Sequence, residues 1–281
     1  AGYGQARGIT AGNMQIGSVT GSGVSFGKQG ERLDLDLASA EANDFRHGDV
    51  AVDRAAVRDA DIAVDNGNLD ATAASARLEG AAFQDMRAGA VQVDDIALQR
   101  DRASGALDAT LGGVAADGFR KGDVSVDSAR IAATTIGVTP GSSGARIGVS
   151  TDRVQVGGLD TGKQSASGID LGGVDFALQN GQGNVDVQRV NATDFASGTF
   201  RAGELNANGA NATFGAGARN GQGGFEANVT DAQLDRWSAG NIGADRATAA
   251  GIGIAGGDGQ LAVGVDHGGV DGLRAGEVTA G

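Results

Sequence analysis

The sequence contains no cysteine, one proline and few aromatic residues, which make up 4% of its 281 residues. Without cysteine the chain has no disulfide, no thiolate nucleophile and no cysteine-ligated metal, while the redox compartment stays open. The near absence of proline argues against a proline-rich disordered segment. Long apolar runs are also missing, since none approaches the ~18 residues of a membrane-spanning helix. No signal peptide is visible.

Positive charge is scarce, because 22 lysines and arginines face 35 aspartates and glutamates, for a net charge of −13. Binding to nucleic-acid phosphates depends on basic side chains that release counterions. We therefore expect no nucleic-acid partner, and anionic membrane surfaces are disfavoured for the same reason. An acidic surface of this kind keeps a repetitive β protein soluble and its sheet edges apart.

Glycine is abundant, with 51 residues, and valine is the leading large apolar residue. A modest content of large apolar residues combined with a high net charge makes disorder an alternative. Valine favours strands, however, and the apolar residues recur at regular intervals. Both features favour an ordered all-β protein.

A repeat runs along the whole chain. Apolar stretches end at polar, glycine-rich breaks, and the last apolar residues before these breaks lie 34 to 40 residues apart: Phe26, Val64, Leu98, Val138, Leu178, Phe214 and Ile254. A second landmark alternates with the first at spacings of 36 to 40 residues: Phe45, Phe83, Phe119, Leu159, Phe195, Leu234 and Leu273. A period of this size is typical of repeat architectures in which each unit buries its apolar face on its neighbour.

Within each repeat the apolar residues step by five, as in Val52, Val57 and Ile62. Such a step changes faces in a straight strand, but not in a chain that turns a corner or bulges every five residues. Half a repeat, about 19 residues, would extend roughly 60 Å as one strand, whereas typical strands have ~5–6 residues. We therefore predict a β-solenoid of about seven repeats of ~38 residues. The alternative is an elongated antiparallel meander of bent hairpins.

The predicted organisation is a single elongated β-repeat domain over residues 1–281. The last repeat stops shortly after it begins, and the chain starts without methionine. These two features indicate a mature or excised segment of a longer repeat array.

No motif for catalysis or ligand binding emerges. His47 and His267 are far apart and lack partners at metal-ligand spacing, so we interpret them as surface residues. The calcium-like stretches DNGNLD (65–70) and GGDGQL (256–261) are better explained by the turn chemistry of Asn, Asp and Gly. Trp237 is isolated, and the phenylalanines are interpreted as a stacked internal ladder. We assign no catalytic, cofactor-binding or metal-binding residue and predict no enzyme activity and no cofactor.

Two stretches, FRHGDVAVDRAAVRDADIAV (45–64) and FRAGELNANGANATF (200–214), resemble known families. Their pattern is similar to the repetitive β segments of large bacterial envelope proteins of the AsmA/TamB-like lipid-bridge type, which implies a long β structure with an apolar groove. The five-residue unit also resembles the pentapeptide-repeat family, which implies a square β-helix that can mimic DNA. Neither resemblance implies a role for a particular residue.

Three functional hypotheses follow. The first is a non-catalytic scaffold or stalk segment of a larger bacterial surface, envelope or secretion-associated protein. The second is a lipid- or partner-binding β groove of an envelope transport protein, and the third is an acidic DNA mimic. The partners expected from these hypotheses are a protein, another copy through the sheet edges, or lipid. The expected location is the cell envelope or the extracellular space.

Overall fold

The computed structural model describes all residues except 1, 143, 216–223, 258–259 and 277–281, and it leaves the side chains of residues 257, 260 and 261 undescribed. Strands account for 85% of the described residues, which contain no helix. The all-β prediction is therefore confirmed. No segment of the described chain forms a helix long and apolar enough to span a membrane.

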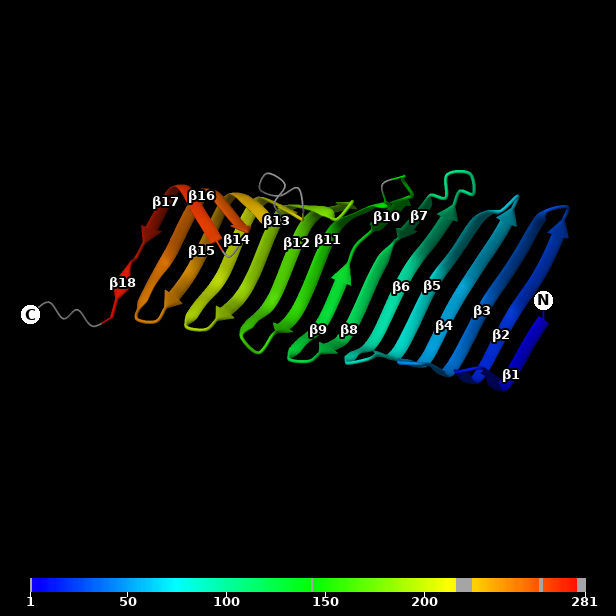
Figure 1. The fold of residues 1–281 in the computed structure, drawn as a ribbon. Coiled ribbons are helices and arrows are strands. Elements are labelled where there is room, and N and C mark those ends of the chain that lie inside the picture. Colours follow the sequence, from blue (N-terminus) through cyan, green and yellow to red (C-terminus); the bar gives the residue numbers. More distant parts are fainter. Residues whose placement is uncertain (1, 143, 216–223, 258–259, 277–281) are drawn as a thin grey trace, which may run out of the picture. The chain divides into compact units, whose positions relative to one another are not determined.

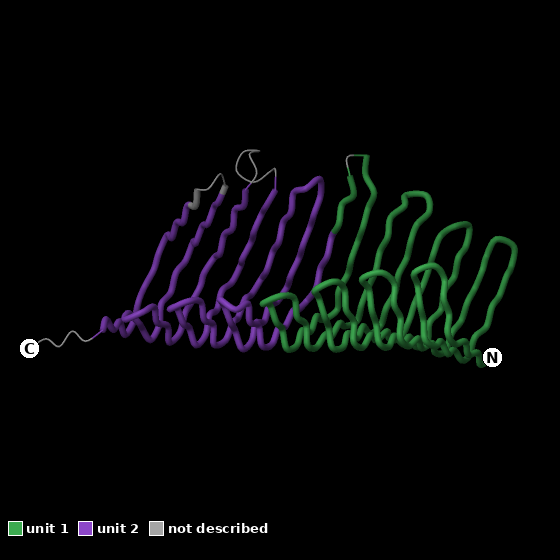
Figure 2. Tube along the Cα trace, turned by 60° about the horizontal axis from the view of Figure 1, so that its bottom comes forward, with its two compact units in different colours: residues 1–147 green, residues 148–281 purple. Residues whose placement is uncertain are grey.

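The chain divides into two compact units, residues 1–147 and 148–281 (Figure 2). The first unit holds β1 (Gly2–Ala11), β2 (Met14–Gln29), β3 (Arg32–His47), β4 (Val50–Asp65), β5 (Asn68–Phe83), β6 (Met86–Arg100), β7 (Leu107–Leu111), β8 (Gly113–Lys121), β9 (Val124–Ile131) and β10 (Thr134–Thr139). The strands of the second unit begin with β11 (Arg146–Asp160), followed by β12 (Gln164–Gln179), β13 (Gln182–Ser197), β14 (Phe200–Phe214), β15 (Phe225–Ala239), β16 (Ile242–Gly257), β17 (Gln260–Asp271) and β18 (Arg274–Ala275).

Within each unit, strands that follow one another in the chain pair antiparallel (Figure 1). In the first unit the path is interrupted once, where β6 pairs with both β7 and β8, and these pair in turn with β10 and β9. The interruption between β7 and β8 lies at Gly112, whose N–H donates to the carbonyl oxygens of Asp94 and Asp95. In the second unit β18 returns to pair with β16.

This pairing fits the antiparallel meander that the sequence left as the alternative, and the preferred β-solenoid is not confirmed. The preference rested on the usual strand length, but β3 and β4 each run for 16 residues. Long strands are feasible here because a bulge bends the strand without ending its pairing to its neighbour. The single domain over residues 1–281 stays a prediction.

Bulges also explain the five-residue step. Between β3 and β4, Leu37 pairs with Ala60 and Ser39 pairs with Arg58, so that Ala38 and Asp59 have no Cα partner. Asp59 has a φ of 46°, in the left-handed region that aspartate enters more readily than most residues. One extra residue on each strand restores the side-chain alternation, and the apolar residues stay on the same face.

From β1 to β6, left-handed residues inside the strands recur with a period of 36 residues. Gly8, Asp44 and Gly80 lie 36 residues apart, as do Gly23, Asp59 and Asp95. Two strands of 16 residues and two turns of two residues, such as Gly30–Glu31 and Asn66–Gly67, account for this period. The repeated-strand architecture is thus confirmed, and longer connections such as residues 101–106 raise the mean spacing of the sequence landmarks above 36.

The structure has little conventional core. No large side chain among the described residues is fully buried, and the buried apolar side chains are the alanines Ala166, Ala192, Ala196, Ala202, Ala207 and Ala244. Stabilisation must therefore come largely from side chains that pack against their cross-strand neighbours on the same face of the sheet.

Candidate functional site

One face of the sheet is apolar along the whole length of its strands, and we call it the apolar face. On β4 the steps of two and three residues place seven residues on it: Val50, Val52, Ala55, Val57, Ala60, Ile62 and Val64. The residues between them, including Arg54, Arg58 and Asp61, lie on the opposite polar face. The separation of the two faces depends on the bulges, because each three-residue step brackets one.

Rows of apolar residues cross the strands of each unit on this face. One row of directly paired residues crosses the first unit from β2 to β10: Phe26, Leu35, Ile62, Ala71, Leu98, Ala109 and Ile136. A corresponding row crosses the second unit from β12 to β17: Ile169, Ala192, Leu205, Leu234, Ala247 and Val270. Neighbouring strands lie ~4.8 Å apart, so each row presents apolar side chains at about that spacing.

In the described part of each unit, several large side chains of the apolar face are exposed, while small ones such as Ala192 and Ala202 are buried. In the first unit Ile62 is 36% exposed and Val24 41% exposed, and in the second unit Val263 is 62% exposed. Contiguous exposed apolar surface on a soluble protein marks a site for a partner, a membrane or an apolar ligand. The apolar face is therefore the principal candidate binding surface.

The apolar face of the second unit carries a group of aromatic rings. Phe200 stacks on Trp237 with the ring centroids 6.5 Å apart, and Phe195 meets Phe200 edge-on at 6.1 Å. Phe176 and Phe214 form a separate stacked pair at 6.4 Å. The indole Nε1 of Trp237 is buried without a hydrogen-bond partner among the described residues. The single tryptophan of the chain thus reports on this face.

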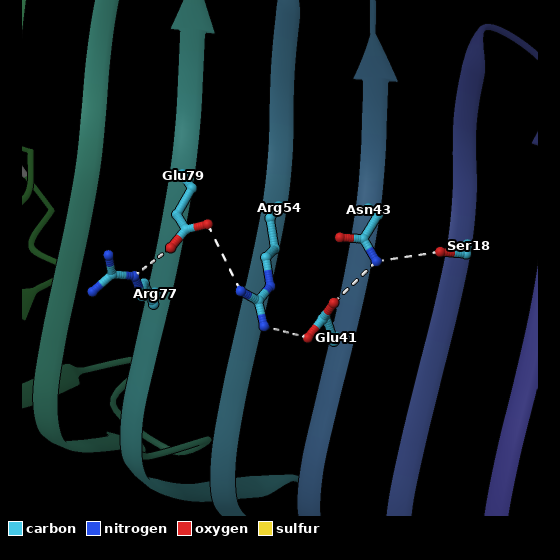
Figure 3. A network of polar contacts seen from close by, with 6 residues as sticks. All are labelled: Ser18, Glu41, Asn43, Arg54, Arg77 and Glu79. Carbon is cyan, nitrogen blue, oxygen red and sulfur yellow. Dashed lines mark hydrogen bonds and ion pairs between the residues drawn. The ribbon is translucent and has the colours of Figure 1, made fainter.

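The polar face carries a network of ion pairs and hydrogen bonds that links β2 to β5 (Figure 3). Arg54 donates to Glu41 at 2.6 Å and lies 3.8 Å from Glu79, which accepts a hydrogen bond from the Nε of Arg77 at 2.7 Å. Glu41 also accepts from the amide of Asn43 at 3.1 Å. The hydrogen bond from Arg54 holds the pKa of Glu41 below its ordinary value. These charges are largely exposed, so each pair stabilises the fold only weakly.

Two cavities open on the surface within the described residues. The first has a volume of about 340 Å³ and is lined by Arg54, Ala56, Arg58, Ser75, Arg77, Glu79 and Gln92 on β4, β5 and β6. The second, of about 670 Å³, is lined by Asp160, Gly162, Lys163, Gln164, Ser165, Ala196, Ser197, Gly198 and Arg201 near the turns of β11 to β14. The surface of the first cavity is mainly polar, whereas that of the second is polar and apolar in about equal parts.

The pKa is raised for one carboxyl group of the polar face and lowered for two others. Asp36 and Asp61 are direct cross-strand partners, and the contact with Asp36 raises the pKa of Asp61 above its ordinary value of 3.8. A hydrogen bond from Ser25 lowers the pKa of Asp36. In the second unit, the Nε of Arg153 donates to Asp170 at 2.9 Å and lowers the pKa of that carboxyl group.

The residues weighed from the sequence lie apart from these cavities. His47 ends β3 opposite Met14 and Val50, and His267 lies on β17 opposite Ala250. Groups of three or more His, Cys, Asp or Glu side chains that could hold a metal ion do not occur among the described residues. In the stretch 65–70, the amide of Asn66 donates to Asp65 within a two-residue turn. The stretch 256–261 includes residues outside the described part of the chain.

Sequence reasoning missed the polar cavity over β4 to β6. Its lining residues come from three strands, and nothing in the spacing of Arg58, Arg77 and Gln92 indicates that they share a cavity. The apolar face, by contrast, had a signal in the five-residue step. The expected internal ladder of phenylalanines is also only partly realised, because Phe26 is 70% exposed.

Comparisons with known proteins give no relatives. No family model matches the chain, and neither the curated proteins nor the solved structures include a match.

Proposed function

We propose that the chain binds lipid acyl chains on the apolar face of its sheet. The observation that carries the proposal is the uninterrupted apolar row across each unit, with large side chains such as Ile62 and Val263 left exposed. Covering such a surface removes apolar area from water, which favours binding by roughly 25 cal/mol per Å².

In the first unit, the composition of the apolar face on β4 favours acyl chains over a protein partner, whereas the second unit adds the aromatic rings around Trp237. Protein interfaces combine aromatic and arginine anchors with a polar rim of hydrogen-bonding groups. The face of β4 instead presents only Val, Ala and Ile, which offer an acyl chain contact along its length without demanding a particular partner. The resemblance of residues 45–64 to AsmA/TamB-like lipid-bridge segments supports the same choice, together with a place in the bacterial envelope.

A second candidate function is a non-catalytic scaffold or stalk. The constant 36-residue period from Gly8 to Asp44 to Gly80 favours it, because a regular array extends by adding identical hairpins. The DNA-mimic hypothesis has the least support, since arginines such as Arg54 and Arg153 are paired with acids on the polar face and interrupt a run of negative charge.

The test uses Trp237, the single tryptophan, as a reporter of the apolar face. Palmitic acid brominated on its acyl chain quenches indole emission only at close range, so bound ligand should quench Trp237 saturably, whereas unbrominated palmitic acid should not. The variant Val270→Asp places a charge on the apolar face, in the cross-strand row that contains Leu234 near Trp237, and should weaken the quenching about tenfold. The matched control His267→Asp changes a residue of the same strand that is exposed on the opposite face.

Three outcomes would count against lipid binding: quenching that does not saturate, quenching that is equal in Val270→Asp and His267→Asp, or no quenching at all. The last result, found together with a folded monomer, would favour the scaffold.

A further inference from the structure

The cavity on the polar face of β4 to β6 exists because a small residue stands among long ones. Ala56 lies between Arg54 and Arg58 on the same strand and face, and Arg77 is its direct partner on β5. Three long cationic side chains therefore surround a methyl group. The result is the cavity of about 340 Å³, which we call the arginine hollow.

The lining of the arginine hollow holds more cationic than anionic side chains. Arg54 is engaged by Glu41 and Glu79, and Arg77 is engaged by Glu79 and by the Oε1 of Gln92 at 3.3 Å. The amide of Gln92 in turn donates to Asp94 at 2.9 Å, outside the lining. Glu79 is thus the one carboxylate in a lining that holds three guanidinium groups, so the lining itself carries a net positive charge, while Glu41 and Asp94 contact lining residues from outside it.

Two hydrogen-bond donors of the hollow are unused. Among the described residues, Arg58 makes no ion pair or side-chain hydrogen bond, and the hydroxyl of Ser75 makes none either. The two residues are direct cross-strand partners, so both side chains lie on the same side of the sheet at the same level. A guanidinium group and a hydroxyl group so placed can donate together to one oxyanion.

We propose that the arginine hollow binds an oxyanion, a phosphate or carboxylate group, through Arg58 and Ser75 with the free N–H groups of Arg77. This site lies on the polar face and does not depend on the proposed lipid binding by the apolar face. The two N–H groups of a guanidinium can donate to two oxygens of a carboxylate or of a phosphate. The proposed ligand is therefore defined as a group with two such anionic oxygens.

The test follows the Nε–Hε signals of the arginines by NMR while inorganic phosphate, or acetate in a second series, is added at constant ionic strength. We expect saturable shifts of the Arg58 and Arg77 signals, and Arg58→Gln should weaken binding about tenfold. Saturation by phosphate alone assigns the site to phosphate groups, and saturation by acetate alone assigns it to carboxylates.

Two further variants separate the hollow from general surface charge. Ala56→Leu keeps every charge but fills the hollow, and it should abolish the saturable shifts. Arg130→Gln is the matched control, because Arg130 is also exposed on this face but lies opposite Ala115 on β8 and outside the hollow. The proposal is overturned if neither anion saturates, if Ala56→Leu binds like the parent chain, or if Arg130→Gln weakens binding as much as Arg58→Gln.

Discussion

The two faces of the sheet are built from the same strands but carry different chemistry. On β4 the apolar face presents Val57 and Ile62, whereas the polar face presents Arg54 and Arg58 beside a network that extends to β2. A flat 16-residue strand with a five-residue apolar step would mix the two sets of side chains. The contrast shows that the left-handed residues inside the strands are what keep the two faces distinct.

The two faces also differ in whether their side chains contact partners on neighbouring strands. Polar residues find partners on neighbouring strands, as Asn191 does with Glu204 and Asn206 at 3.0 and 2.7 Å. On the apolar face, large side chains such as Ile62 and Val263 are left exposed in the described part of the chain. These exposed apolar side chains are why the proposed acyl-chain ligand is placed on the apolar face.

The largest expected effect on stability comes from a substitution at a bulge. Gly23 has a φ of 64°, and a Cβ at this position would overlap the Cβ of Ala38, which cannot rotate away. Gly23→Ala should destabilise the fold by about 2–4 kcal/mol, through left-handed strain and overpacking together. Chemical denaturation measures this loss, and Gly4→Ala is the control, because its Cβ would meet no atom within 4 Å. Equal stability of the two variants would refute the structural role of the bulge.

The next effect separates the faces by ligand binding. Ile62→Lys places a charge on the apolar face, whereas Ala63→Lys places the same charge on the polar face between Asp34 and Asp70. Acyl-chain binding, measured by calorimetry with palmitic acid, should weaken about tenfold in Ile62→Lys alone. Similar losses in both variants would show that net charge, and not the apolar face, controls binding.

A smaller effect on Tm is expected at Asp61, which is paired with Asp36 on the neighbouring strand. Because the neighbouring Asp36 raises the folded-state pKa of Asp61, ionisation of Asp61 disfavours the folded state once the pH exceeds that pKa. Asp61→Asn should therefore raise Tm at pH 7, and the gain should disappear as the pH falls below the ordinary value of 3.8. Thermal unfolding at several pH values tests this, and a gain that persists at pH 3 would contradict it.

The smallest effect concerns Asp170, where the substitution should lower Tm at pH 7 and not raise it. Arg153 lowers the folded-state pKa of Asp170, so the ionised carboxylate stabilises the fold above its ordinary pKa of 3.8 and loses this contribution as the pH falls through the lowered pKa. Asp170→Asn should slightly lower Tm at pH 7 and have no effect in strong acid. A thermal unfolding series in both conditions checks the sign, and a rise in Tm at pH 7 would be inconsistent with the ion pair.

The all-β class and the repeat could be predicted from the sequence because both depend on local patterns of apolar and turn residues. The step from Val52 to Val57 to Ile62 follows the bulges directly, and turns such as Asn66–Gly67 mark the hairpin ends. The choice between solenoid and meander could not be made from these patterns, since corners and bulges use the same residues. The pairing of Leu35 with Ile62 is a long-range fact that only the structure supplies.

The candidate sites were harder to predict than the fold. The exposure of large side chains on the apolar face depends on the arrangement of the strands in space, which no local pattern of Val and Ala encodes. The arginine hollow depends on Ser75 and Arg77 lying beside Arg58 and Ala56, and this requires the register of β4 and β5. Residues that are ordinary in sequence thus become a candidate site through strand pairing.

The most direct test of the central claim is native mass spectrometry of the purified chain, combined with organic extraction of what accompanies it. Lipid binding by the apolar face predicts co-purifying lipid in roughly stoichiometric amount, released by solvent and diminished in Ile62→Lys but not in Ala63→Lys. A bare monomer that carries no extractable lipid, and takes up none when palmitic acid is added, would contradict the claim and leave the scaffold as the function to pursue.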